Sequence, residues 1–189
     1  MLPVLVVLII LALVAASQFM PSISQVERPK DEPNKPSNLT VTENQYILLE
    51  AESAKEVVLP MTIGRASEES CSEGAFLEIP LQDPRGSEKV KGSAIVPFRV
   101  AVPGKYLLHA RCWWFDNCGN SFSVSIDDSN SLKLTDSTLK HWHWVALQKR
   151  PFLLTAGEHQ LVVANSEDGA RIDQIMLTND PEYVPQGIE

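Results

Sequence analysis

Short strand-like runs separated by turn residues fill the chain from Gln45 onward, and they limit the fold more than any other feature. Gly and Pro mark the turns, as at Val102–Lys105 and Thr155–Glu158. No segment of about ten or more residues has a helical period. Strands at this spacing without intervening helices predict an all-β fold, an antiparallel β-sandwich. The expected strands are Tyr46–Ala51, Ala75–Ile79, Ser93–Val102, Gly104–Phe115, Ser121–Ile126, His143–Gln148, Gln160–Asn165 and Ile172–Thr178.

Alternation along Gly104–Phe115 separates a core face from an outer face, because successive side chains of a strand point to opposite sides of the sheet. We expect Trp113 to point outward beside Arg111. The same test puts Trp142 and Trp144 on one side of their strand, so both are buried or both are exposed. The expected core face consists of Tyr106, Leu108, Ala110, Cys112 and Trp114.

The N-terminal part differs in composition from the strand-rich part. Residues 1–20 contain an uncharged apolar run that ends in small residues, which is typical of a signal peptide. No Lys or Arg precedes the run, so an uncleaved membrane anchor is the alternative. Residues 21–44 are rich in Pro and polar side chains and are expected to form a disordered tether. The module is expected at 45–180, followed by a C-terminal tail at 181–189.

Both interpretations of the N-terminal segment place the module outside the cytoplasm, so it is secreted, on the cell surface or in the periplasm. Membrane contact is expected only through that segment, if it is uncleaved. The 189 residues have a formal net charge of −8 and no basic cluster, which argues against a nucleic-acid partner. A chain of this length has room for one well-buried core.

The chain has three cysteines, Cys71, Cys112 and Cys118. An exported protein enters an oxidising compartment, so at least one disulfide is expected. Cys112 with Cys118 is the local pairing, and Cys71 with either of them is equally compatible with the sequence. The odd thiol is then free or pairs with a second molecule.

Carboxylates inside apolar strand-like runs form the first candidate site. Glu50 and Glu52 lie in ILLEAES, and Asp173 lies in ARIDQI. An ionised carboxylate that loses water needs a partner, a proton or a metal. If these terminal strands meet, the simplest partner for three anions is a divalent cation with oxygen ligands, and calcium is the first candidate.

Two tryptophan-rich segments form the second candidate site, and they contain all four tryptophans of the chain. Sugars pack their C–H faces on aromatic rings and need planar amide or carboxylate partners for their hydroxyls, so this composition suits glycan binding. The alternative is that the rings cap the end of the core. The candidate residues are Trp113, Trp114, Asp116, Asn117, Trp142 and Trp144.

Catalytic motifs are absent from the sequence: it has no nucleophile motif, phosphate loop or metal-protease helix. His141 and His143 are spaced to share one strand face and could hold a transition metal, but a hydrogen-bonded pair is the more common arrangement. We therefore expect a protein that binds its ligand without catalysis.

A series of motifs resembles the carbohydrate-binding modules of families 6 and 35, which are galactose-binding-like sandwiches. In chain order they are LLEAES, GAFLEIP, VPGKYLLHARCWWFDNCGNSFSVSID, HWHWVAL, LTAGEHQLVV and DGARIDQIML. The resemblance implies a jelly-roll sandwich with a structural calcium ion bound by Glu50, Glu52 and Asp173. It also implies a glycan site in the Trp113–Asn117 loop and the Trp142–Trp144 segment. Arg171 falls near the final-loop position where family members commonly carry Asn, and it completes the candidate sugar site.

The sequence thus predicts an exported, calcium-stabilised module that binds a polysaccharide or other glycan through its tryptophan-rich loops. A structural or adhesive surface protein whose sandwich no longer binds sugar is the alternative.

Overall fold

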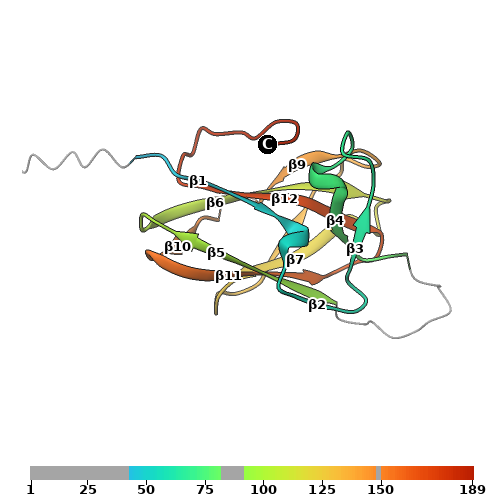
Figure 1. Ribbon diagram of the computed structural model, residues 1–189, viewed down its shortest axis with the longest axis horizontal. Helices are drawn as coiled ribbons and strands as arrows, with labels where there is room; N and C mark the ends of the chain where they lie inside the picture. The colour runs from blue at the N-terminus through green and yellow to red at the C-terminus, as the bar shows by residue number, and fades with distance from the viewer. Residues whose placement is uncertain (1–42, 82–91, 148–149) are drawn as a thin grey trace, which may run out of the picture. The chain divides into compact units, whose positions relative to one another are not determined.

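Two antiparallel β-sheets make up the computed structural model, which describes residues 43–81, 92–147 and 150–189 (Figure 1). The N-terminal segment expected at 1–20 and all but the last two residues of the expected tether lie outside the described residues. One sheet has seven strands and the other has five. The all-β sandwich predicted from the sequence is confirmed.

The seven-stranded sheet is built around two long central strands, β6 and β12, which pair with each other. On one side of this pair β6 also pairs with β9 and β10, and on the other side β12 pairs with β1 and β4. Strand β3 follows β4 at the edge. The bounds are β1 Tyr46–Glu50, β3 Thr62–Arg65, β4 Ala75–Glu78, β6 Gly104–Trp114, β9 His143–Ala146, β10 Phe152–Leu154 and β12 Ala170–Thr178.

The five-stranded sheet has the order β2-β5-β11-β7-β8. Its strands are β2 Glu56–Val58, β5 Ser93–Val100, β7 Ser121–Ile126, β8 Leu132–Thr135 and β11 Gly157–Asn165. Two short 3-10 turns, η1 Ala51–Ser53 and η2 Ser72–Gly74, follow β1 and precede β4. Within the described residues, no helix is long and apolar enough to cross a membrane.

The core lies between the facing sides of the two sheets and follows the alternation of the strands. Every member of the core face predicted for β6 is at most 1% exposed, which confirms that prediction. Four strands were not expected, namely β2, β3, β8 and β10. They have only three or four residues each, too few for an alternating pattern to stand out. Their strand geometry comes from pairing, of β2, β8 and β10 with longer strands and of β3 with β4.

A β-bulge interrupts β12 where it passes β6. Ile172 pairs with Cys112, and Ile175 pairs with Ala110. Between these two pairs β12 advances by three residues and β6 by two. Both isoleucines are fully buried in the core. The two residues between them, Asp173 and Gln174, are therefore both free to turn away from the core, which a regular strand would allow for only one.

A hydrogen-bonded histidine links the turn after β7 to β11. His159 Nδ1 lies 2.6 Å from Asp127 Oδ2, and its Nε2 lies 2.9 Å from the Thr155 carbonyl oxygen. Both neighbours only accept hydrogen bonds, so the geometry favours the doubly protonated ring. Burial lowers the pKa of His159, but the hydrogen bonds to Asp127 and Thr155 outweigh it and leave the pKa raised above 6.5.

We expect this contact to make stability depend on pH. Because the pKa is raised in the folded state, its contribution is fully present below pH 6.5 and is lost as the pH rises through the folded-state pKa. Urea unfolding between about pH 5.5 and 8.5 should show wild type losing about 1 kcal/mol relative to His159→Gln. Parallel pH profiles for the two proteins would contradict this assignment.

Candidate functional site

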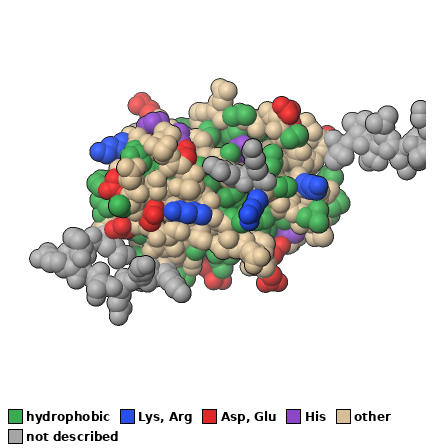
Figure 2. All heavy atoms as spheres, turned by 180° about the vertical axis from the view of Figure 1, so that it is seen from behind, with side chains coloured by type: hydrophobic (Ala, Val, Ile, Leu, Met, Phe, Trp, Pro, Cys, Tyr) green, Lys and Arg blue, Asp and Glu red, His purple; other side chains and the backbone are tan. Residues whose placement is uncertain are grey.

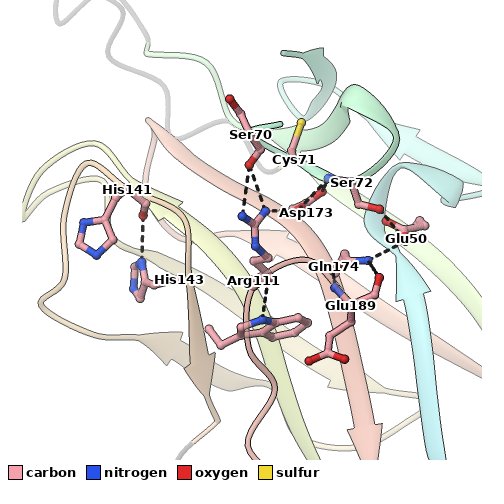
Figure 3. Close-up of polar contacts among 12 residues, drawn as sticks. Glu50, Ser70, Cys71, Ser72, Arg111, His141, His143, Asp173, Gln174 and Glu189 are labelled. Atoms are coloured by element: carbon pink, nitrogen blue, oxygen red, sulfur yellow. Dashed lines mark hydrogen bonds and ion pairs between the residues drawn. The ribbon is translucent and has the colours of Figure 1, made fainter. Parts of the chain in front are cut away.

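Three carboxylates from β1, η1 and β12 converge on the outer side of the seven-stranded sheet, and Figure 3 shows two of them, Glu50 and Asp173. Glu50 ends β1, Glu52 lies in η1, and Asp173 lies in the bulge of β12. One oxygen from each lies within 4.8 Å of the others. We call these residues the carboxylate cluster. The sequence prediction that these residues meet in space is thus confirmed.

Protein donors satisfy only part of the carboxylate cluster. Asp173 accepts hydrogen bonds from the backbone N–H of Ser72 at 3.1 and 3.2 Å. Glu50 Oε1 accepts from Ser72 Oγ at 3.1 Å and from Gln174 Nε2 at 2.8 Å (Figure 3). Glu50 Oε2 and both oxygens of Glu52 are buried without a hydrogen-bond partner. Buried carboxylate oxygens without donors are costly, so this arrangement calls for a proton or a cation.

The pKa of Glu52 reflects the lack of donors for its buried oxygens. Burial, followed by the negative charges of Glu50, Asp173 and Glu73, raises the pKa of Glu52 to about 7. Burial also raises the pKa of Asp173, and the hydrogen bonds from Ser72 and Arg111 offset only part of that rise. Three hard oxygen donors with unfilled lone pairs fit a calcium ion better than a soft or nitrogen-preferring metal.

Among the residues that the structure describes, Arg111 is the cation that pairs with the carboxylate cluster. Its Nη1 pairs with Asp173 Oδ2, and both terminal nitrogens donate to the Ser70 carbonyl oxygen at 3.2 Å. The Arg111 side chain is 9% exposed and that of Asp173 is fully buried. The guanidinium thereby fixes the loop before η2 against β6 and β12 (Figure 3). Alternation had placed Arg111 on the outer face, but nothing in the sequence identified its partner.

An aromatic cluster lies on the same side of the sheet, next to Arg111. The guanidinium carbon of Arg111 is 5.3 Å from the centre of the Trp142 ring, and Trp142 packs edge-on against Phe76 at 5.5 Å. The guanidinium of Arg171 lies 5.1 Å from the Phe76 ring and 4.5 Å from the Trp113 ring. Its Nε donates to Glu78 Oε2 at 3.1 Å. We call Phe76, Trp113, Trp142 and Arg171 the aromatic cluster.

The aromatic cluster continues into an exposed apolar surface. Trp113 packs against Phe115 with ring centres 6.3 Å apart. Phe115 is 36% exposed and Leu81 is 56% exposed. Gly169 (φ +79°) lies between them, since a Cβ there would approach the Phe115 Cβ to 2.9 Å and Leu81 Cδ2 to 3.0 Å. Trp113 on β6, Phe115 in the loop after β6 and Leu81 in the loop after β4 thus form one surface, and Trp113 joins it to Arg171.

The candidate sugar-binding residues divide into two groups. Trp113, Trp142 and Arg171 meet in the aromatic cluster, as the sequence prediction requires. Trp114 does not, because it lies on the core face of β6, is 0% exposed and donates from Nε1 to Asp136 at 2.9 Å. Including Trp114 in the sugar site was therefore wrong, whereas the alternation that placed it in the core was right.

Three other candidates lie outside the aromatic cluster. Trp144 is half-buried and donates to the Gly187 carbonyl oxygen at 3.0 Å. Asp116 accepts a hydrogen bond from the Cys118 backbone N–H at 2.8 Å, which stabilises its own loop. Asn117 is exposed in the same loop.

Residues 181–189, expected as a tail, fold back along the outer side of the seven-stranded sheet (Figure 1). The side-chain amide of Gln174 makes two hydrogen bonds to the Glu189 backbone, at 3.0 and 3.1 Å. Tyr183 packs against Tyr46 with ring centres 4.8 Å apart. Gly187 of this segment thus lies against Trp144, and Glu189 lies against Gln174 beside the carboxylate cluster.

The expected intrachain disulfide is not formed, since all three cysteines are free in the structure. Cys112 points into the core, whereas Cys118 is exposed in the loop after β6, so the local pairing fails. Burial raises the pKa of Cys112 well above its ordinary value, which makes this thiol unreactive. Cys71 is also buried. An intermolecular disulfide stays a prediction.

His143 is held in a hydrogen-bonded network. Its Nε2 lies 3.0 Å from both oxygens of Asp136, and its Nδ1 lies 3.0 Å from the His141 carbonyl oxygen. Among the described residues, the carboxylate cluster is the only group of three or more His, Cys, Asp or Glu close enough to share a metal ion. The hydrogen-bonded alternative therefore describes the two histidines.

Several site residues were not found from the sequence. Phe76 lies at the centre of the aromatic cluster, and a Cβ at Gly64 on β3 would overlap its ring, so that glycine makes the room for it. Glu78, Leu81 and Phe115 complete the surroundings of Arg171. The only sequence feature that could have indicated this site is that Phe76 and Glu78 are two residues apart and so share one strand face. Such pairs are common in sheets.

No protein-family model matches this sequence, and no curated protein matches it. Solved structures do share its fold. A β-(1,4)-mannanase with a family 35 carbohydrate-binding module, from Podospora anserina, aligns with a TM-score of 0.56 and 19% identity over 76% of this chain. The chain spans only 30% of that enzyme.

Two isolated binding modules match over nearly their whole length. The C-terminal family 6 module of a laminarinase from Zobellia galactanivorans aligns at TM-score 0.50 and 19% identity, covering 71% of this chain and 100% of the module. A family 6 module of a Cellvibrio mixtus lichenase, in complex with cellotriose, aligns at 0.52 and 13%, covering 71% and 97%. The domain thus has the fold of carbohydrate-binding modules of the family 6 and 35 type.

Replacing Arg111 should expose the cost of the buried carboxylate. Arg111→Met leaves Asp173 buried without its ion partner and should lower the free energy of unfolding by about 3–5 kcal/mol in urea titrations with chelator. The matched control is Arg171→Met, whose side chain is 37% exposed, and it should cost no more than about 1 kcal/mol. Equal losses in the two variants would contradict this account of the ion pair.

Proposed function

We propose that this protein is a noncatalytic carbohydrate-binding module whose ligand contacts the exposed edge of the aromatic cluster. The observation that carries the proposal is the surface formed by Trp113, Phe115 and Leu81 beside the Arg171–Glu78 pair. The fold, shared with modules that match over nearly their whole length, supports it. A polysaccharide or other glycan is the ligand class.

The chemistry of this surface matches both sides of a sugar. Apolar side chains receive the C–H face of a pyranose ring, and a tryptophan offers the largest such area. The guanidinium of Arg171 donates to ring hydroxyls, while the Glu78 carboxylate accepts from them. Arg171 is already stacked on Trp113 and bonded to Glu78, so little side-chain freedom is lost on binding.

We also propose that calcium occupies the carboxylate cluster as a structural ion. Glu50, Glu52 and Asp173 would be its side-chain ligands, and the ion would supply positive charge to their unpartnered oxygens. Such an ion ties β1 and η1 to β12. Its effect on the aromatic cluster runs through Arg111, which contacts both Asp173 and Trp142.

We place the protein outside the cytoplasm, secreted or at the cell surface. The apolar run at residues 1–20 and the fold shared with modules of polysaccharide-degrading enzymes support this location.

A structural or adhesive role without sugar binding is the second candidate. One observation favours it: the guanidinium of Arg171 lies over Phe76 and Trp113 and covers ring surface that a sugar would otherwise use. Phe76 itself is only 3% exposed. On this account the exposed apolar edge contacts another protein.

Glycan binding should depend on Trp113, which is partly exposed. Affinity gels and calorimetry with cellotriose, laminarin and β-1,4-mannan should retain the full chain on at least one of these, and Trp113→Ala should weaken that binding about tenfold or more. The control is Leu153→Ala, because Leu153 is 81% exposed and lies on β10, outside the site. If Trp113→Ala binds as well as wild type, Trp113 is not part of the glycan site. If no polysaccharide is retained, the result favours the structural or adhesive role.

Calcium should stabilise protein that has been stripped with chelator. At about 100 times Kd, linkage predicts about 2.7 kcal/mol of added stability and a higher Tm. Glu52→Gln should abolish this shift, whereas Glu56→Gln, an exposed carboxylate on β2, should leave it unchanged. The proposed ion would be ruled out if calcium leaves the Tm of the wild type unchanged. It would also be ruled out if calcium raises the Tm of Glu52→Gln by as much as that of the wild type.

A further inference from the structure

A cavity lies away from the aromatic cluster, where β8 of one sheet and β9 of the other come together. Its volume is about 440 Å³, within the range of small-ligand sites. Strand β8 contributes part of the lining, and Ala146 of β9 with Leu147 and Arg150 contributes the rest. Both are edge strands, since β8 pairs only with β7 and β9 only with β6. The lining includes Leu132, Lys133, Thr135, Ala146, Leu147 and Arg150.

The charged side chains that line this cavity are all positive. Lys133 comes from β8 and Arg150 from the chain after β9, and no Asp or Glu is among the described lining residues. This is unusual in a chain with 24 acidic and 16 basic residues, and on the face drawn in Figure 2 the two kinds are interspersed. The cavity thus concentrates positive charge on an acidic protein.

The two cations are largely available to a ligand. Lys133 Nζ lies 3.6 Å from Glu167 Oε1, but the Lys133 side chain is 57% exposed, and a pair of this kind contributes little. Arg150 is exposed and has no hydrogen bond or ion pair with any described residue. Its guanidinium retains all its donors for a carboxylate or sulfate group.

Neutral groups complete the lining. Leu132, Ala146 and Leu147 contribute the apolar part of the lining. Alternate backbone N–H and C=O groups of an edge strand have no partner in the sheet, so β8 offers hydrogen bonds along its part of the lining. Thr135 adds a hydroxyl that donates to the Asn120 carbonyl oxygen and can still accept.

We propose that this cavity is a binding site for an anionic sugar, one that carries a carboxylate or sulfate group held by Lys133 and Arg150. The apolar part of the lining receives the face of the ring, and the edge of β8 bonds its hydroxyls. An acidic peptide has the same charge, but an extended strand would need a longer edge than the four residues of β8. The proposal does not rest on the aromatic cluster.

The full chain tests this with dextran sulfate, polygalacturonate and neutral dextran in affinity gels. We expect retention by at least one anionic polymer and none by neutral dextran. The polymer that is retained identifies sulfate or carboxylate as the recognised group. Lys133→Gln/Arg150→Gln should weaken that binding about tenfold or more. The control, Lys55→Gln/Arg65→Gln, removes the same charge at exposed residues outside the cavity and should bind like wild type.

Several results would overturn the assignment. If neither anionic polymer binds, the cavity is not an anionic-sugar site. If the two double variants lose the same amount of affinity, the polymer is attracted to the overall charge of the protein. Loss in Trp142→Ala equal to that in Lys133→Gln/Arg150→Gln would place the ligand at the aromatic cluster. Tighter binding of polyglutamate, with the same dependence on Lys133 and Arg150, would replace the sugar by an acidic peptide. Far-UV circular dichroism of each variant confirms that the fold is kept.

Discussion

The burial of three carboxylates against one guanidinium is the constraint on which the outer side of the large sheet depends. An ionised group without water must be compensated locally, so the elements that supply the partners have little freedom in position. Asp173 binds Ser72 and Arg111, and Glu50 binds Ser72 and Gln174. These contacts fix β1, the loop before β4, β6 and β12 relative to one another. The oxygens left without donors define where a cation would add the most stability.

The same guanidinium connects this polar region to the aromatic cluster. Arg111 bonds Asp173 on one side and lies over Trp142 on the other, and Trp142 packs on Phe76. A cation over an indole contributes about 0.5–2 kcal/mol, more when water is excluded. The structural and the proposed binding regions are therefore neighbours that share one residue. A change in Asp173 or in the proposed ion would affect Trp142 through the side chain of Arg111, which contacts both residues.

Alternation and turn residues predicted most of the fold, because a strand buried on one side has apolar residues at every second position of the sequence. The core face of β6 is an example, whereas the meeting of Glu50 with Asp173 was implied only by the family resemblance. The bulge in β12 has no such pattern in the sequence, and it is what allows both Asp173 and Gln174 to leave the core. Trp114 misled the prediction of the sugar site because a cluster of aromatic letters does not separate adjacent residues that point to opposite sides. Phe76 was missed because its role depends on the space beside Gly64 in a neighbouring strand.

A crystal structure of the protein grown with calcium tests the central claim most directly. The account predicts one anomalous peak in the carboxylate cluster, about 2.3–2.6 Å from oxygens of Glu50, Glu52 and Asp173. Arg111 should still pair with Asp173 and contact Trp142. A structure that holds only a water molecule there at saturating calcium, with the carboxylates turned toward solvent or protonated in pairs, would contradict it.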